Sequence, residues 1–344
     1  MTGHATRTTD VLFTQPRLAM RVGFVLVLCC AVLAGGRPTL ADDASDTAPI
    51  KLKITESADA KVTLDRALAL TRERFPAGLP FTAQYARIEG APVINIQVLT
   101  EEAAEGATKQ VVQHVRVDGA SEKIADVTSS ALPETPLGSL GQAYKHHKAK
   151  LIPAEQAIAA ALAEAKDGKP IDVTLGGASD EPTWLVMLAT GERLVTIELG
   201  AITGNAVARF DWEERLRKAH DFFKQYETLV GANEATLTDL YADTAAIRVF
   251  SRGKDGLQEE GLLPGSEYKR ALQMVLPMLE QQGAKKHFED VRYAIDSFGV
   301  RIFATAKTTV MKSTGPAEWV MGPDPEGQWR VLEEVIKPPT RGGH

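Results

Sequence analysis

The chain repeats one stretch of its own sequence, and this duplication limits what it can fold into. Residues 62–68 read VTLDRAL, and a similar segment, IPAEQAI, returns at 152–158. Residues 92–98, PVINIQV, return at the same offset of ninety positions as PTWLVML at 182–188. Further along, the offset falls to eighty-two, which places an eight-residue insertion in the first copy, around 101–110. A single repeat with so long a period indicates a duplicated small domain, because solenoid repeats are much shorter.

The first 41 residues are typical of a secretory signal peptide. A basic stretch that ends at Arg21 precedes the apolar run 22–34, and residues 39–41, Thr-Leu-Ala, offer a small-residue cleavage site. Met20, directly before Arg21, is the more typical first residue for such a peptide. The apolar run has thirteen residues, fewer than the roughly 20 that a membrane-spanning helix needs. We therefore predict an exported protein, periplasmic or secreted, with no stable membrane span after cleavage.

Cysteine content and charge exclude several classes of function. Cys29 and Cys30 both lie in the apolar run, so the mature chain is expected to hold no cysteine. Disulfides, thiolate nucleophiles and thiolate metal ligands are then excluded. The formal net charge of the whole chain is −6 at pH 7, and residues 1–41 carry four Arg and one Asp, so cleavage makes the protein more acidic. Nucleic acid is not an expected partner, because phosphate binding needs a basic surface.

The sequence predicts neither a cofactor nor a metal site. The glycine-containing stretch 253–265 lacks the strand-to-helix signature of a phosphate-binding loop. His146 and His147 are adjacent, and neighbouring residues of a helix point in different directions, so the pair is not suited to hold one metal ion. We interpret residues 144–150, YKHHKAK, as a solvated basic surface.

Each copy of the duplicated segment predicts one helix followed by three strands. Apolar residues at helical spacing run from Leu64 to Phe75 in the first copy, with Thr63 placed to cap the start, and from Ala154 to Leu162 in the second. The predicted strands span 81–88, 93–100 and 111–117, then 171–175, 184–189 and 193–199. One helix across a three-stranded antiparallel sheet is a complete small α+β unit.

The residues of both copies resemble the PepSY domain. Each helix opens with a β-branched residue, then Thr or Pro, and an acid before an Ala-hydrophobic pair. The last strand runs into a turn that keeps Asp118 in the first copy, with Glu122 in place of the turn glycine, and keeps Gly204 but no Asp in the second. The resemblance covers 58–127 and 150–208, with a linker at 128–149. It implies an exported or membrane-associated binding and regulatory module, in some members linked to restraint of peptidases, and no catalytic residues.

A different module follows from residue 211. A long amphipathic helix begins at Trp212, and a short helix, a strand and a helix capped by Ser266 come next. Four strands then close the chain, at 287–295, 300–311, 317–321 and 328–336.

This order resembles the NTF2-like, or SnoaL-like, cone fold. The residues that carry the resemblance are Leu240-Tyr-Ala-Asp243 before a strand, Gly265 before the third helix, and Gly327-Gln-Trp-Arg-Val331 at the last strand. It covers 211–337 and leaves 338–344 as a disordered tail. The predicted fold class is thus α+β, with two small PepSY-like units and a C-terminal NTF2-like cone.

The resemblance implies an interior pocket, in which related folds carry out isomerase or dehydratase chemistry. On the strand 287–295, His287 and Tyr293 share the more apolar face, which we predict to point inward. The candidate pocket-lining residues are Tyr241, His287, Tyr293, Trp319 and Trp329. His287 and Tyr293 lie six positions apart, about 20 Å along a strand, which is too far for one reacting centre. We therefore assign no catalytic residue.

Three functions remain open on this basis. The first is a non-catalytic binding or regulatory protein with a pocket for a small apolar ligand. The second is an isomerase- or dehydratase-type enzyme that uses the cone pocket, for which a buried carboxylate beside a second polar group would be the sign. The third is a peptidase-inhibiting or envelope scaffold protein that acts through the PepSY-like units, with an envelope protein or peptidase as partner. A homodimer through the outer face of the cone sheet, with Arg301, Phe303 and Thr305, is also predicted.

Overall fold

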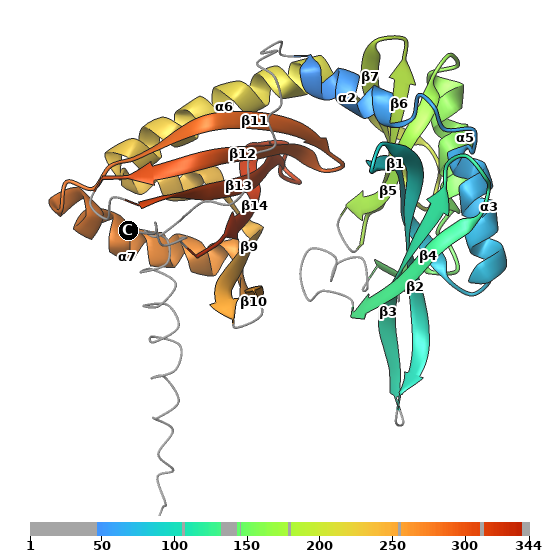
Figure 1. The fold of residues 1–344 in the computed structure, drawn as a ribbon, viewed down its shortest axis with the longest axis horizontal. Coiled ribbons are helices and arrows are strands. Elements are labelled where there is room, and N and C mark those ends of the chain that lie inside the picture. The colour runs from blue at the N-terminus through green and yellow to red at the C-terminus, as the bar shows by residue number, and fades with distance from the viewer. Residues whose placement is uncertain are drawn as a thin grey trace, which may run out of the picture.

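The computed structural model describes residues 47–104, 107–131, 143–144, 146–177, 180–253, 256–309 and 313–338. The predicted signal peptide, most of the predicted linker and nearly all of the predicted tail therefore lie outside the described residues. The described chain forms an N-terminal unit and a C-terminal unit, each built on one sheet (Figure 1). We use these two names for residues 47–211 and 212–338. In the described residues no helix combines the length and the apolar character needed to cross a membrane.

In its described residues, the N-terminal unit is built on three helices of nine or more residues and an eight-stranded sheet. The helices are α2 (Ala48–Glu56), α3 (Leu64–Arg74) and α5 (Ala154–Glu164). The strands are β1 (Leu79–Ile88), β2 (Ala91–Ala104), β3 (Ala107–Asp118), β4 (Ile124–Ala131), β5 (Lys169–Gly177), β6 (Pro182–Thr190), β7 (Arg193–Gly200) and β8 (Ala206–Asp211). Helix α2 and the outer strands β4 and β8 are additions to the predicted elements.

The two copies share one sheet, where the sequence alone suggested two separate units. The strand order is β4-β3-β2-β1-β5-β6-β7-β8, so β1 of the first copy pairs with β5 of the second. The pairing is antiparallel, and Ala83 faces Val173, its own counterpart ninety positions later. A local twofold axis therefore passes through this pair and relates the copies. Helices α3 and α5 lie side by side on one face, where Arg72 forms an ion pair with Glu155 at 2.5 Å.

Equivalent backbone positions are fixed in both copies, but by different side chains. In the first copy the Tyr85 hydroxyl donates to the carbonyl of Val62 at 2.8 Å. In the second copy the Trp184 indole N–H donates to the carbonyl of Ile152, the equivalent residue, at 3.1 Å. Each bond holds the chain just before a helix begins. Thr63 also caps α3 as predicted, since its hydroxyl accepts a hydrogen bond from the backbone of Arg66.

The eight-residue insertion of the first copy lengthens a hairpin. Strands β2 and β3 stay paired beyond the equivalent strands β6 and β7, out to the pair Ala104 and Ala107. The insertion thus extends an existing ladder and leaves the rest of the repeat in register.

The C-terminal unit combines two long helices with a six-stranded sheet. The helices are α6 (Trp212–Ala232) and α7 (Gly265–Gln281), with the short 3₁₀ helix η1 (Ala235–Leu240) after α6. The strands are β9 (Tyr241–Gly253), β10 (Gly256–Pro264), β11 (Lys286–Asp296), β12 (Gly299–Thr308), β13 (Ser313–Pro323) and β14 (Trp329–Ile336), in the order β10-β9-β14-β13-β12-β11. Only the β14–β9 pair is parallel among these described strands. Helix α6 packs against β11 and β12, and α7 packs against β9.

Two places join the units. Strand β8 runs directly into α6, whose first residue, Trp212, is fully buried and donates its indole N–H to Thr196 on β7 at 2.9 Å. At the second place the turn between β11 and β12 reaches β5, and α2 lies between the N-terminal sheet and β11 (Figure 1). The whole described structure is α+β, with most core residues on the strands.

Candidate functional site

A chain of hydrogen bonds runs through the interior of the C-terminal unit and ends at a carboxyl group. The Trp319 indole N–H donates to the Tyr226 hydroxyl at 3.1 Å. The hydroxyls of Tyr226 and Tyr241 are 3.1 Å apart, and the Tyr241 hydroxyl donates to Glu334 Oε2 at 2.7 Å. These four residues, which we call the interior cluster, come from α6, β9, β13 and β14. They place a carboxyl group and two phenols within direct reach of one another.

The interior cluster is closed off from solvent. Relative exposures are 0% for Trp319, 2% for Tyr226 and Tyr241 and 6% for Glu334. Aromatic rings surround it, because the Phe288 ring meets Trp319 edge-on at 5.1 Å and the Tyr268 ring meets Tyr241 at 5.3 Å between centroids. Solvent molecules therefore have almost no access to the carboxyl group in this conformation.

Burial changes the acidity of the cluster. Burial raises the pKa of the Glu334 carboxyl, and the charge of Lys286 and the hydrogen bond from Tyr241 oppose this rise only in part. The pKa of Tyr241 also lies well above its ordinary value, through burial first and the neighbouring Glu334 charge second. A low-dielectric interior disfavours the charged form of an acid, so the neutral carboxyl group persists to a higher pH than in water.

Replacing Glu334 by Gln is expected to flatten one part of the pH dependence of stability. The folded protein holds the Glu334 proton to a higher pH than the unfolded chain does, since an unfolded Glu has a pKa of about 4.3. Its contribution to stability is full below that value and is lost as the pH rises toward the raised folded pKa. The unfolding free energy of Glu334→Gln minus that of the parent should thus increase with pH, by at most about 1.4 kcal/mol per unit. Denaturant unfolding at several pH values measures this difference.

Glu213, an exposed acid near the start of α6, provides the matched control. Glu213→Gln makes the same chemical change at an exposed position, so a difference between the two variants reports the burial of Glu334. A Glu334→Gln difference that stays constant from pH 4 to pH 8 would contradict the buried-acid account.

The structure separates the five residues that the sequence grouped. Tyr241 and Trp319 lie in the interior cluster. Tyr293 is half-buried and its ring stacks on His220 of α6 at 3.8 Å, while Trp329 is half-buried near Phe222.

The prediction that His287 points into the C-terminal unit is wrong. Its side chain is 54% exposed and pairs with Glu289 at 3.6 Å, so it points outward. The reason is a register shift in β11 between Glu289 and Arg292, where Asp290 adopts a positive φ of 52°. A bulge reverses the alternation of side chains, which turns Phe288 inward before it and Tyr293 inward after it.

Sequence reasoning missed the residue that gives the cluster its chemistry. Glu333 and Glu334 are adjacent on the last strand, so one of them had to face the core. Glu334 does, opposite Trp319, while Glu333 lies on the outer face. This pair of adjacent acids was the available signal.

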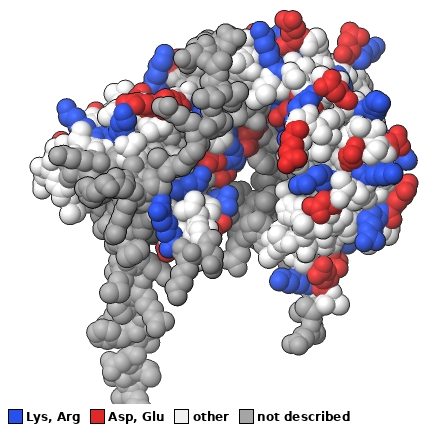
Figure 2. Space-filling model, viewed as in Figure 1, with Lys and Arg blue, Asp and Glu red and all other residues white. Residues whose placement is uncertain are grey.

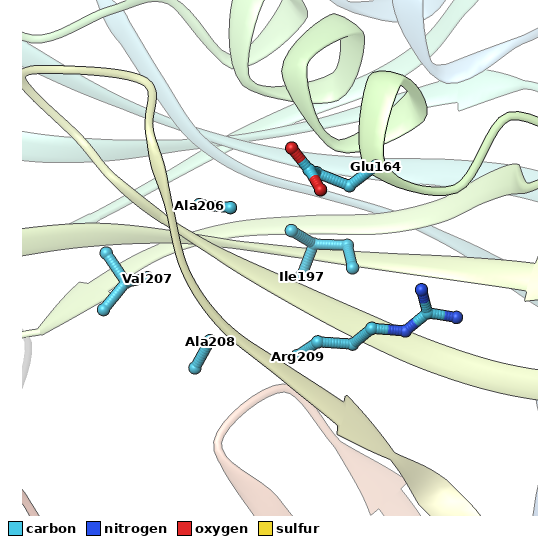
Figure 3. Close-up of a pocket in the computed structure, with 6 residues that line it drawn as sticks. All are labelled: Glu164, Ile197, Ala206, Val207, Ala208 and Arg209. Atoms are coloured by element: carbon cyan, nitrogen blue, oxygen red, sulfur yellow. The ribbon is translucent and has the colours of Figure 1, made fainter.

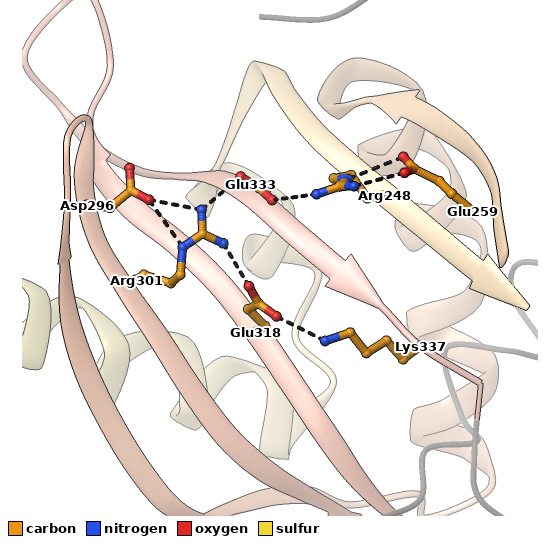
Figure 4. Close-up of polar contacts among 7 residues, drawn as sticks. All are labelled: Arg248, Glu259, Asp296, Arg301, Glu318, Glu333 and Lys337. Carbon is orange, nitrogen blue, oxygen red and sulfur yellow. Dashed lines mark hydrogen bonds and ion pairs between the residues drawn. The ribbon is translucent and has the colours of Figure 1, made fainter. Parts of the chain in front are cut away.

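The outer face of the same sheet carries a network of ion pairs (Figure 4). Arg301 contacts Glu318 at 2.7 Å, Asp296 at 2.9 Å and Glu333 at 3.4 Å. The network continues from Glu333 to Arg248 and Glu259 and from Glu318 to Lys337. Burial alone would lower the pKa of Arg301, but the surrounding carboxylates outweigh it and raise that pKa. Of the residues predicted for a dimer interface, Arg301 is thus engaged within its own chain.

Two hollows lie near β8, one beside the strand and one where the strand runs into α6. One, of about 220 Å³, is lined by Glu164, Ile197, Ala206, Val207, Ala208 and Arg209 (Figure 3). The other, of about 440 Å³, is charged and is lined by Arg193, Asp211, Glu213, Glu214 and Arg217. The first hollow is lined mainly by β8, the outermost strand of the eight-stranded sheet, and the second mainly by the start of α6.

The described residues hold no group of three or more His, Asp or Glu side chains that could bind a metal ion. Basic and acidic side chains are interspersed over the visible surface (Figure 2), with no segregation into a single basic face there.

Among known proteins, the chain is similar only to solved structures, and not to any family model or curated protein sequence. A structure assigned as a lipoprotein from Clostridium difficile 630 covers 45% of this chain and 97% of its own, at 13% identity and a TM-score of 0.30.

An NTF2-like family protein from Streptomyces avermitilis, assigned as a dehydratase, covers 37% of this chain and 97% of its own, at 12% identity and a TM-score of 0.27. An NTF2-like protein with a cystatin-like fold from Novosphingobium aromaticivorans covers 38% and 85%, at 12% identity and a TM-score of 0.26. We carry no activity over from these proteins.

Proposed function

We propose that this is an exported, non-catalytic binding or regulatory protein, with two PepSY-like copies fused into one sheet and an NTF2-like C-terminal unit. The observation that carries the proposal is the closure of the interior cluster. An enzyme of this architecture needs its acid or base within reach of a substrate. Here Glu334 is 6% exposed and its partners are at 2% or less.

The hydrogen bonding of the cluster supports the same conclusion. Hydrogen bonds link all four residues, from the Trp319 indole through the Tyr226 and Tyr241 hydroxyls to Glu334. A buried polar network that is satisfied internally rigidifies a core. The cluster thus serves the packing of the C-terminal unit, and binding takes place on the outer surface.

The end of the N-terminal sheet at β8 is the surface that we propose for a protein partner. Val207 on this strand is 65% exposed, and it lines the same hollow as Ile197. An exposed apolar side chain beside an apolar hollow is typical of a contact site, and an outer strand also offers unpaired backbone groups. The chemical class that suits it is a polypeptide of the cell envelope.

The first test is native mass spectrometry of the protein purified from its export compartment, compared with its denatured mass. The proposal predicts a chain that carries no retained small molecule, together with a complex with a second polypeptide. A stoichiometric small molecule that disappears on denaturation would overturn binding at the outer surface and would point to a ligand site inside the C-terminal unit. The same spectrum measures whether the protein is a homodimer, which remains a prediction.

Paired variants then locate the contact. Val207→Glu should weaken the complex at least tenfold, because it puts a charge beside the apolar hollow. Val127→Glu is the matched control, since Val127 is 37% exposed on β4 at the other end of the same sheet. Equal affinity of the two variants would remove β8 as the contact surface.

A second candidate function, an enzyme that uses the interior of the C-terminal unit, is favoured by one observation. Glu334 has a raised pKa and a phenol at 2.7 Å, which is the arrangement of a general acid beside a hydrogen-bond donor. This candidate requires an opened conformation. A retained molecule that Glu334→Gln releases, while Glu213→Gln keeps it, would support this second candidate.

A further inference from the structure

The contact between the two units has a buried carboxyl group at its centre. Asp172 lies on β5 and is 2% exposed. The Thr174 hydroxyl, on the same strand, donates to Asp172 Oδ1 at 3.0 Å. The Ser297 hydroxyl, in the turn between β11 and β12 of the C-terminal unit, donates to Oδ2 at 3.2 Å. One carboxyl group is therefore shared by residues 125 positions apart in the chain.

A third element, α2, brings a cation to the same place. Lys53 Nζ lies 4.0 Å from Asp172 Oδ2, at the edge of ion-pair distance. Lys53 is closer to Glu56 on its own helix, at 3.1 Å, and also reaches Gln84 of β1 at 3.5 Å. Asp172 thus shares its only nearby cation, among the described residues, with a second carboxylate. Its charge is incompletely balanced.

The turn that covers Asp172 fits closely against β5. The Phe298 ring stands over Gly176, and a Cβ added at Gly176 would lie 2.6 Å from its Cε1 atom. Ser297 contacts the carboxyl group directly, while Phe298, which is 41% exposed, packs beside it on Gly176. When this turn lifts away, water gains access to Asp172.

We propose that docking of the β11–β12 turn onto β5 takes up a proton at Asp172, so that the junction tightens in acid and loosens as the pH rises. The inference rests on the contacts around Asp172 and does not depend on the proposed function. It makes the junction between the units a pH-responsive latch.

The sign follows from what surrounds the carboxyl group. Burial raises the pKa of Asp172, and Lys53 and the two hydroxyls oppose this rise only in part. Asp296, at the end of β11, adds a like charge and raises the pKa further. The groups that face Asp172 from the other elements are Glu56 of α2, which is acidic, and Gln84 of β1, which is neutral.

Because the docked state keeps its proton to a higher pH than the open state, a lower pH favours docking. Opening exposes Asp172 to water and removes the Asp296 charge, so the pKa of Asp172 is lower in the open state. Opening therefore increases with pH between that lower pKa and the raised pKa of the docked state. The equilibrium constant for opening changes by at most about tenfold per pH unit for one proton.

Amide hydrogen exchange of the full chain, corrected for the intrinsic pH dependence of exchange, tests the latch. Segments that cover 170–176 and 294–300 should lose protection as the pH rises from 4 to 8, relative to β13 in the core of the C-terminal unit. In Asp172→Asn, which cannot ionise, protection of both segments should be independent of pH. Asp221→Asn, on the exposed surface of α6, should behave like the parent.

Two results would overturn the proposal. One is protection of these segments in the parent that does not change with pH relative to β13. The other is an Asp172→Asn variant that folds and keeps the parent pH dependence. If that variant does not fold, Ser297→Ala keeps the carboxyl group and removes only the bond from the turn. It should lower protection at 294–300 at every pH and keep the slope, and a slope lost in this variant would also count against Asp172.

Discussion

Replacing Trp319 by alanine is expected to lower the free energy of unfolding by about 3–5 kcal/mol, the usual range for a buried Trp. The ring is fully buried and touches Tyr226, Phe223 and Phe288, so its loss leaves a cavity that the sheet cannot close. The Tyr226 hydroxyl also loses its donor. Denaturant unfolding of the purified protein measures the change.

Trp319→Phe separates the two contributions to this loss. It keeps most of the ring and removes the N–H, so it should cost about 1–3 kcal/mol, the range for disturbing a buried hydrogen bond. A Trp319→Ala variant within 1 kcal/mol of the parent would mean that the interior of the C-terminal unit is not packed as described.

Replacing Trp212 by alanine is expected to cost about as much, roughly 3–5 kcal/mol, and to change the form of the unfolding transition. Trp212 is fully buried at the start of α6, where it bonds to Thr196 of the N-terminal sheet. The Arg215 guanidinium lies 5.4 Å from its ring. Because this side chain joins the two units, its removal should uncouple them. Calorimetry should show one transition for the parent and resolve two for Trp212→Ala.

Thr196→Val is the matched variant for the junction. It keeps the packing around Trp212 and leaves the indole N–H without its acceptor, which should cost about 1–3 kcal/mol. The units should still unfold together. A single transition in Trp212→Ala, at any loss of stability, would show that other contacts suffice to couple the units.

Local features of the fold were predictable wherever a short-range pattern determined them. The apolar spacing of 64–75 and the cap at Thr63 predicted α3. The change of repeat offset predicted the position of the insertion, which lengthens the β2–β3 hairpin. Pairing of β1 with β5 was not predictable, because three backbone pairs at the seam carry no sequence signature. The position of α2 depends on both units at once, which no local pattern encodes.

The candidate site was predictable only in part, and the reason is one residue in β11. Strict alternation placed Tyr293 on the inner side and assigned His287 to the same side. The bulge at Asp290 separates the two. A bulge depends on how a strand bends against its neighbours. The sequence around Asp290 has no glycine that would have predicted the positive φ of this residue. Tyr241 and Trp319 were predicted to line a pocket and lie in the interior cluster, as expected of large aromatic residues. Glu334 was missed because a carboxyl group ordinarily favours the surface.

The seam between the two copies also has a consequence for stoichiometry. A dimer of two identical repeats would present the same residue twice, at equal distances from its symmetry axis. In this chain the position of Asp172 is occupied by Thr82 in the other copy, and the axis runs between them at Ala83 and Val173. Only one half of the face can therefore offer an acid to an incoming turn. Because both copies belong to one chain, the two halves of the face can differ at this position, and the β11–β12 turn contacts the half that carries the acid.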